Sequence, residues 1–195
     1  MAARILVFAG SARRDSLTKK LARAAAQYAR EAGAEATFVD LDDYPIPLYH
    51  GDLEAASGMP ENARKLRGIF LAHDALIIAS PENNSSMSSL LKNTIDWLSR
   101  DVEDGKGDSS GLAPWRGKVA GLMAASPGGF GGIRALPHLR QILAALGVTV
   151  LGTQVAVPRA HEAFAADGSV VDERVAKSVR SLAEAVAQAA QRLRG

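Results

Sequence analysis

Short apolar runs alternate with longer amphipathic segments along this chain of 195 residues, and this alternation is what most restricts its fold. Apolar runs bounded by turn residues are typical of buried strands, whereas leucine and alanine at helical spacing indicate helices. Strands are predicted over 4–9, 36–41, 75–80, 119–125 and 148–157. Helices are predicted over 16–32, 60–72, 90–100, 133–146 and 172–193, with irregular segments over 42–58 and 101–117.

Strands that alternate with helices predict a parallel sheet, because each right-handed crossover places a helix on one face. The expected fold class is therefore α/β: a doubly wound, five-stranded parallel sheet with strand order 2-1-3-4-5 and helices on both faces. A hydrophobic content of 47% suits a sizeable core. No repeat or linker divides the chain, so residues 1–195 are expected to form a single domain.

Composition excludes several classes of function. The chain has no cysteine, which rules out disulfides, thiolate nucleophiles and iron-sulfur clusters, so any redox chemistry needs a bound cofactor. The net charge is only +2 and the basic residues are scattered, which argues against a nucleic-acid partner. No apolar run is long enough to cross a membrane, and the first residues read as a strand and not a signal peptide. A cytoplasmic protein is expected.

The first strand is followed by a polar loop suited to an anion. Gly10 to Thr18 leads from a strand into a helix, and helix N-termini attract phosphate through free amides and the helix dipole. The loop has neither the glycine-lysine-hydroxyl ending of a Walker loop nor the three spaced glycines of a dinucleotide fingerprint. We interpret it as a mononucleotide phosphate cradle, although Ser16 as a helix N-cap and Arg13 as a solvated surface residue explain it equally well. The predicted ligands are Ser11, Arg13, Ser16 and Thr18.

Two further loops follow the third and fourth strands. Residues 80–89 are rich in amide and hydroxyl groups, and residues 126–132 contain four glycines that allow a flat ring to approach the backbone. In the predicted strand order, all three loops surround the crevice where open α/β sheets bind ligands. Their joint occurrence predicts a ligand site more strongly than any one of them.

These segments resemble the NAD(P)H-dependent FMN reductases, a family with a flavodoxin-like fold that includes quinone, chromate and azo-dye reductases. Residues 10–16 look like the family's phosphate loop, residues 81–84 with 91–97 its flavin loop and following helix, and residues 126–132 with Arg134 its third loop. The resemblance covers essentially the whole chain. One departure is Asn83, which stands where the family usually has a tyrosine beside the flavin ring. Ser85, Ser88 and Ser89 also replace the common glycine, proline and glycine.

The resemblance implies an oxidoreductase that uses FMN and NADPH, or NADH, to reduce a quinone, free flavin, azo compound or similar acceptor by ping-pong kinetics. It also implies a homodimer or homotetramer. Because the cofactor carries the chemistry, no catalytic side chain is predicted, and the isolated histidines predict no metal site. The residues expected along the two ring edges are Pro81, Glu82, Asn83, Asn84 and Ser85 on one side and Ser126, Pro127, Gly128 and Gly129 on the other. Arg13 and Arg14 favour NADPH slightly over NADH.

Three other classes of protein share parts of this pattern. A phosphorelay receiver needs an acidic cluster after the first strand, where this chain has Phe8-Ala9-Gly10-Ser11, so that class is rejected. A flavodoxin-like electron carrier would bind FMN too, but such carriers tend to be strongly acidic. A flavin-free relative that binds another ligand is the third alternative, prompted by Asn83. Trp97 is expected in the core or an interface, and Trp115 either pins its loop or reaches a neighbouring subunit's site.

Overall fold

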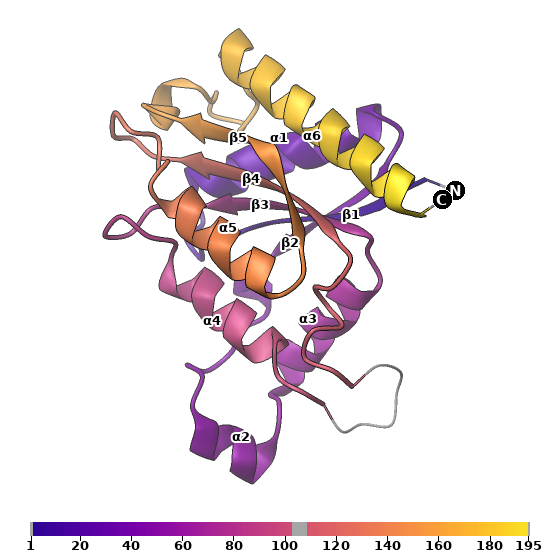
Figure 1. Ribbon diagram of the computed structural model, residues 1–195. Coiled ribbons are helices and arrows are strands. Elements are labelled where there is room, and N and C mark those ends of the chain that lie inside the picture. The colour runs from indigo at the N-terminus through magenta and orange to yellow at the C-terminus, as the bar shows by residue number, and fades with distance from the viewer. Residues whose placement is uncertain (1, 103–108, 195) are drawn as a thin grey trace.

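The computed structural model describes residues 2–102 and 109–194 and contains a five-stranded parallel sheet with strand order β2-β1-β3-β4-β5 (Figure 1). This confirms the predicted fold class and strand order. The strands are β1 (Arg4–Ala9), β2 (Glu35–Asp40), β3 (Ala75–Ser80), β4 (Val119–Ala125) and β5 (Thr149–Val157). The helices are α1 (Leu17–Glu31), α2 (Gly51–Ser57), α3 (Glu61–Leu71), α4 (Ser89–Leu98), α5 (Ala135–Ala145) and α6 (Glu173–Arg194), with short 3-10 turns η1 (Leu41–Asp43) and η2 (Ala160–Glu162).

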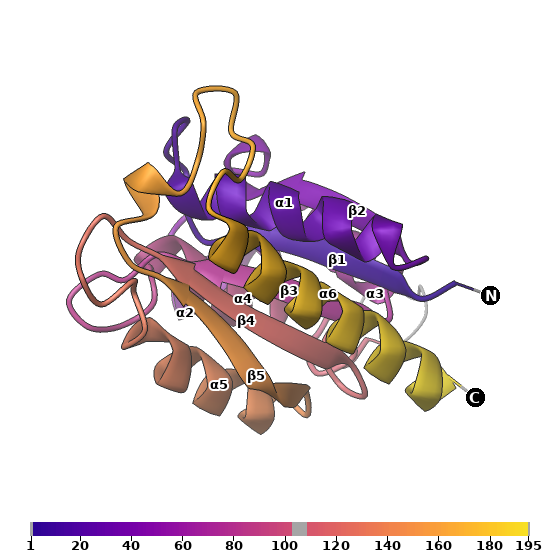
Figure 2. The ribbon, with the colours of Figure 1, turned by 90° about the horizontal axis from the view of Figure 1, so that it is seen from above.

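Helices cover both faces of the sheet. Figures 1 and 2 show α1 and α6 on one face and α3, α4 and α5 on the other. Successive residues of a strand point to opposite faces. Accordingly, Ile5 and Val7 of β1 join the core beneath α1 and α6, whereas Leu6 and Phe8 join the core on the other side. Because β1, β3 and β4 are buried on both faces, their sequences are continuously apolar and do not alternate.

Helix starts follow local capping chemistry. The Ser16 side chain accepts a hydrogen bond from the Lys19 amide and caps α1, and the Ser88 side chain does the same for α4 through the Leu91 amide. Gly33 and Gly147 follow the ends of α1 and α5 with φ of 84° and 82°, a conformation that glycine adopts without strain. Element boundaries therefore fall within about two residues of those predicted, a usual margin at helix ends.

The segment 42–58 was predicted to be irregular, and the structure corrects this. It contains part of η1 and the whole of α2, a helix of seven residues whose N-cap is the His50 side chain. Helix α2 has no buried residue, so it lacks the apolar stripe from which a helix is recognised in sequence. Of the predicted loop 101–117, residues 103–108 lie outside the described residues.

Both tryptophans are core residues. Trp97 is fully buried, and its indole Nε1 donates to the Pro47 carbonyl oxygen at 2.8 Å, which holds the segment before α2 against α4. Trp115 is equally buried and packs edge-on against Phe70, with 5.0 Å between ring centroids. Trp115 therefore pins its loop to α3 and does not project from the surface. Among the residues that the structure describes, no helix combines the length and apolarity needed to cross a membrane.

Candidate functional site

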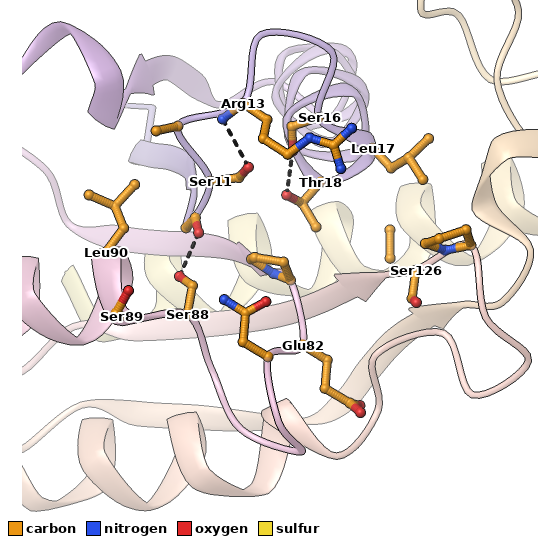
Figure 3. A pocket seen from close by; sticks show the side chains of 16 residues that line it. Ser11, Arg13, Ser16, Leu17, Thr18, Glu82, Ser88, Ser89, Leu90 and Ser126 are labelled. Carbon is orange, nitrogen blue, oxygen red and sulfur yellow. Dashed lines mark hydrogen bonds between the residues drawn. The ribbon is translucent and has the colours of Figure 1, made fainter.

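A cavity of about 370 Å³ lies at the carboxyl edge of the sheet, between the loops that follow β1, β3 and β4 (Figure 3). Its place next to β1 and β3 is where the strand order reverses, which is the usual ligand crevice of doubly wound sheets. Its volume is within the range of small-ligand pockets, about 300–1,000 Å³. The lining residues are Gly10, Ser11, Ala12, Arg13, Ser16, Leu17, Thr18, Pro81, Glu82, Asn83, Ser88, Ser89, Leu90, Ala125, Ser126 and Pro127.

The loop after β1 contains the predicted helix cap and also borders the cavity. Ser16 caps α1, with its Oγ 3.3 Å from the Lys19 amide nitrogen, and it also lines the cavity and lies 2.8 Å from the Thr18 hydroxyl. The Ser11 hydroxyl accepts from the Arg13 amide at 3.3 Å, which folds the loop back on itself. Within the described residues, the Arg13 guanidinium has no hydrogen-bond or ion-pair partner, and it lies beside the cavity mouth (Figure 3). The arrangement offers hydroxyls and a free cation to an anion.

A buried ion pair supports this loop from below. Lys19, in the first turn of α1, is only 2% exposed, and its Nζ lies 2.7 Å from Oδ1 of Asp40 at the end of β2. The other oxygen of Asp40 lies 3.7 Å from Arg23. Removal of one partner from such a pair leaves an uncompensated buried charge, which costs more than the pair itself contributes. Asp40 therefore has a structural role.

The loop after β3 ends in a tight hairpin. Asn83 and Ser86 form an antiparallel bridge with N–H to carbonyl distances of 2.9 and 3.0 Å. The two residues between them, Asn84 and Ser85, have φ of 50° and 64°, as a type I′ turn requires. His138 of α5 holds the hairpin through Nδ1, 2.9 Å from the Ser86 hydroxyl. The hairpin thus presents the Asn83 side of the loop to the cavity and turns Asn84 and Ser85 away from it.

Glu82 joins the loop after β3 to the loop after β4. Its carboxylate accepts from Nε of Arg134 at 2.7 Å and from the Arg134 amide at 3.1 Å, and it also pairs with the Arg134 terminal nitrogen. The Arg134 guanidinium lowers the pKa of Glu82, mainly through the side-chain hydrogen bond. Figure 3 shows the Glu82 side chain directed away from the first loop. Glu82 was expected along a ring edge, and its carboxylate is engaged in this ion pair.

The glycine loop after β4 is firmly seated. A Cβ at Gly131 would lie 2.7 Å from the backbone of Val157 and Pro158, and Gly131 has a φ of 62°, so only glycine fits there. The Ser126 carbonyl accepts from the Ala160 amide, and the Gly128 carbonyl accepts from the Arg159 amide, at 3.0 and 3.2 Å. These contacts fix the backbone of a segment whose composition alone suggests flexibility.

The structure brings most of the predicted residues together. Those that line the cavity are Ser11, Arg13, Ser16, Thr18, Pro81, Glu82, Asn83, Ser126 and Pro127. Those that do not line it are Asn84, Ser85, Gly128 and Gly129. Lining residues that sequence reasoning missed are Gly10, Ala12, Leu17, Ser88, Ser89, Leu90 and Ala125. Ser88 was the one most open to recognition, because a serine three residues before the amide of Leu91 at a helix start is a capping signal.

The donors present fit a flavin mononucleotide. Arg13 is an unpaired cation among the described residues, and the amides of Leu17 and Thr18 at the start of α1 have no helical partner, whereas the next amide, of Lys19, is capped by Ser16. The opposite end of the cavity is formed by Asn83 and Pro127. Asn83 provides a polar edge there, and Pro127 provides an apolar one. An FMN with its phosphate at the first loop and its ring between the two later loops would occupy both ends. Which residues contact the flavin remains a prediction.

Comparisons with known proteins give the family. A family model described as NADPH-dependent FMN reductase matches residues 3–162. The chain belongs to this family. It is 39% identical over 151 residues to an NAD(P)H-dependent FMN reductase of Pseudomonas aeruginosa, an alignment that covers 77% of this chain and 76% of that one. It is 33% identical over 182 residues to a 2-hydroxy-1,4-benzoquinone reductase of Burkholderia sp, with 93% and 92% covered.

Solved structures agree with these matches. The flavoenzyme NAD(P)H:(acceptor) oxidoreductase FerB of Paracoccus denitrificans superposes with a TM-score of 0.80 at 30% identity, over 97% of this chain and 98% of that one. A flavodoxin of Streptococcus pneumonia superposes with a TM-score of 0.60 at 14% identity over 96% and 99%, which shows the shared fold alone. The expected family and flavodoxin-like fold are therefore confirmed, together with the expected enzyme class, an NAD(P)H-dependent FMN reductase or quinone oxidoreductase.

Proposed function

We propose that this member of the FMN reductase family binds FMN in the cavity at the carboxyl edge and reduces a quinone with electrons from NADPH or NADH. The observation that carries the proposal is the free Arg13 guanidinium beside the N-terminus of α1, at one end of a cavity whose other end lies between two loops. An anion there receives charge-assisted hydrogen bonds. Ser11 and Thr18 add hydroxyl donors around the same position.

Bound FMN supplies hydride acceptance and donation at its ring, and the protein supplies position and surroundings. The Asn83–Ser86 hairpin sets one ring edge, because its bridge fixes the backbone. Ser126 and Pro127 set the other edge, and their loop is held by Ala160. The ion pair of Glu82 and Arg134 keeps the two edges at a constant separation. Rigid placement of this kind brings donor and acceptor into reacting geometry in turn.

A quinone is the acceptor class that the comparisons support. The relative from Burkholderia sp is a 2-hydroxy-1,4-benzoquinone reductase, and a relative from Pseudomonas putida is a quinone reductase, 34% identical over 71% of this chain. Asn83 in place of an aromatic residue leaves a smaller and more polar side chain at one ring edge. A planar acceptor is accommodated there after the oxidised nicotinamide leaves. Free flavins and azo compounds fit the same opening and belong in the same assay panel.

Anaerobic stopped-flow of the FMN-loaded protein tests the proposal. Flavin absorbance should bleach within seconds of mixing with NADPH or NADH and return when a quinone is added. A yellow protein that neither nucleotide bleaches would indicate the electron-carrier alternative. A colourless protein that ignores added FMN in a fluorescence titration would indicate a flavin-free relative, and either result overturns the proposed function.

A further inference from the structure

Phe130 is a large aromatic side chain left exposed at the carboxyl edge of the sheet. It is 70% exposed, although it belongs to a loop whose neighbouring backbone is fixed against η2 and the end of β5. An exposed phenylalanine on a mobile segment would be unremarkable. On a fixed loop beside a ligand cavity, it suggests that the ring has a partner in the working enzyme.

One face of the Phe130 ring already contacts a side chain, that of Arg134. The guanidinium carbon of Arg134 lies 5.2 Å from the ring centroid, within the range of a cation–π contact. The Arg134 side chain is itself fixed on the Glu82 carboxylate by a hydrogen bond from Nε and an ion pair from a terminal nitrogen, and the Glu82 side chain is only 9% exposed. The contact with Arg134 and the fixed loop backbone therefore both hold the Phe130 ring in place. Most of the Phe130 side chain is still exposed to solvent.

The support connects Phe130 directly to the cavity wall. Glu82 lines the cavity, Arg134 contacts Glu82, and Phe130 contacts Arg134. In addition, Phe130 follows the cavity residue Pro127 by three positions. Figures 1 and 2 show the loops after β3 and β4 projecting side by side from the same edge. Phe130 does not itself line the cavity, but it belongs to the same loop as Pro127 and is joined through Arg134 to Glu82, which does.

We propose that Phe130, braced by Arg134 and Glu82, is the aromatic platform that selects planar ring acceptors in this enzyme. This inference rests on the proposed function and names the residue that recognises the acceptor. Aromatic rings stack in offset or edge-on arrangements, and the Asn83 position offers no ring for this purpose. Phe130 takes over that contact from the opposite loop.

The platform selects shape and not charge. Glu82 neutralises the Arg134 guanidinium through the ion pair, so the support adds little net charge at the ring. Neutral and anionic quinones of the same ring size should therefore depend on Phe130 to a similar degree. A small inorganic oxidant without a ring should not depend on it.

The test isolates the acceptor step. FMN-loaded enzyme is reduced chemically in the absence of NADPH and mixed anaerobically with a naphthoquinone, its sulfonate and ferricyanide. In Phe130→Leu, the half-saturating concentration of both quinones should rise about threefold to tenfold, the range expected for a lost aromatic contact, with ferricyanide unchanged. Phe130→Tyr should restore the wild-type values. Leu193→Ala, which removes an apolar side chain of 62% exposure near the amino ends of the strands, is the matched control.

The outcomes separate this inference from the proposed function. Equal quinone saturation in wild type and Phe130→Leu, with flavin binding and reduction by NADPH intact, overturns the platform and leaves the reductase standing. A similar loss for ferricyanide and quinones in Phe130→Leu also overturns it, because that pattern reports a general change in the loop. Failure of the wild-type flavin to be reduced by NADPH or NADH contradicts the proposed function itself, and the chemically reduced enzyme still reports on Phe130.

Discussion

The hydroxyl of Ser88 donates a hydrogen bond of 2.5 Å to the carbonyl oxygen of Gly10, 78 residues earlier in the chain. The same oxygen of Ser88 accepts from the Leu91 amide at 3.2 Å and so begins α4. One buried side chain therefore fixes the helix after the second cavity loop to the start of the first. The loop after β1 and the end of the loop after β3 are thereby joined.

Replacement of Gly10 should disturb this junction. In Gly10→Ala, the new Cβ would lie 2.8 Å from Cβ of Leu91 and 2.9 Å from Oγ of Ser88, so α4 must move. Overpacking of this kind costs about 1–3 kcal/mol of unfolding free energy. Gly68→Ala in α3 is the control, because nothing lies within 4 Å of its Cβ position, and alanine should stabilise a helix interior there by about 0.5–1 kcal/mol. Urea denaturation measures the unfolding free energy of both variants. Equal changes in Gly10→Ala and Gly68→Ala would contradict the packing argument.

Loss of the Arg13 guanidinium should weaken FMN binding. Arg13→Ala removes the free cation of the first loop, and the affinity should fall by about 1–3 kcal/mol, the range for hydrogen bonds to charged groups. Arg14→Ala is the matched control, because Arg14 lines a separate hollow between α1 and the loop before α6. Flavin fluorescence titration gives both dissociation constants. An unchanged constant in Arg13→Ala would remove this residue from the phosphate site.

The ion pair of Glu82 and Arg134 should make the cavity sensitive to acid. Arg134 lowers the pKa of folded Glu82 from its ordinary value of about 4.3, so the stabilisation is complete above that pH. As the pH falls through the lower folded pKa, Glu82 takes up a proton and the stabilisation is lost. Relative to Glu82→Gln, the wild type should therefore lose unfolding free energy below about pH 4. Thermal unfolding at a series of pH values measures the stability of both proteins. If the two stabilities fall in parallel as the pH is lowered, the ion pair is not the cause of the acid sensitivity.

Lys118 should produce a further rise of stability with pH, at the alkaline end of the range. Its side chain is buried, and its Nζ donates to the His73 carbonyl oxygen. Burial lowers the pKa of Lys118, and the nearby carboxylate of Asp74 opposes this only in part. Between this lowered pKa and the ordinary value of about 10.4, the unfolded chain binds more protons than the folded protein, so stability rises with pH.

The variant Lys118→Met removes this titration. The unfolding free energy of the wild type relative to Lys118→Met should increase as the pH is raised toward about 10. Chemical denaturation at a series of pH values measures the difference. Lys65→Met is the control, because the Lys65 side chain is 55% exposed. A wild-type curve that runs parallel to that of Lys118→Met would show that burial of Lys118 has no effect on proton binding.

The sequence by itself determined the order of elements, the parallel sheet and the three loops at its carboxyl edge. These follow from short-range patterns, because continuous apolar runs such as 75–79 are compatible with few structures besides a buried strand. The capping of α1 by Ser16 is equally local. Helix α2 was missed for the same reason, since no buried residue marks its face.

Tertiary structure decided which loop residues face the cavity and which residues support them. The hairpin turn at Asn84 and Ser85 turns both residues out of the lining, and the pairing of Glu82 with Arg134 directs a predicted ring-edge side chain into an ion pair. Ser88 reaches the cavity through its contact with Gly10. Most of these outcomes depend on contacts between segments far apart in the chain. Local residue patterns do not determine the distance or direction of such contacts.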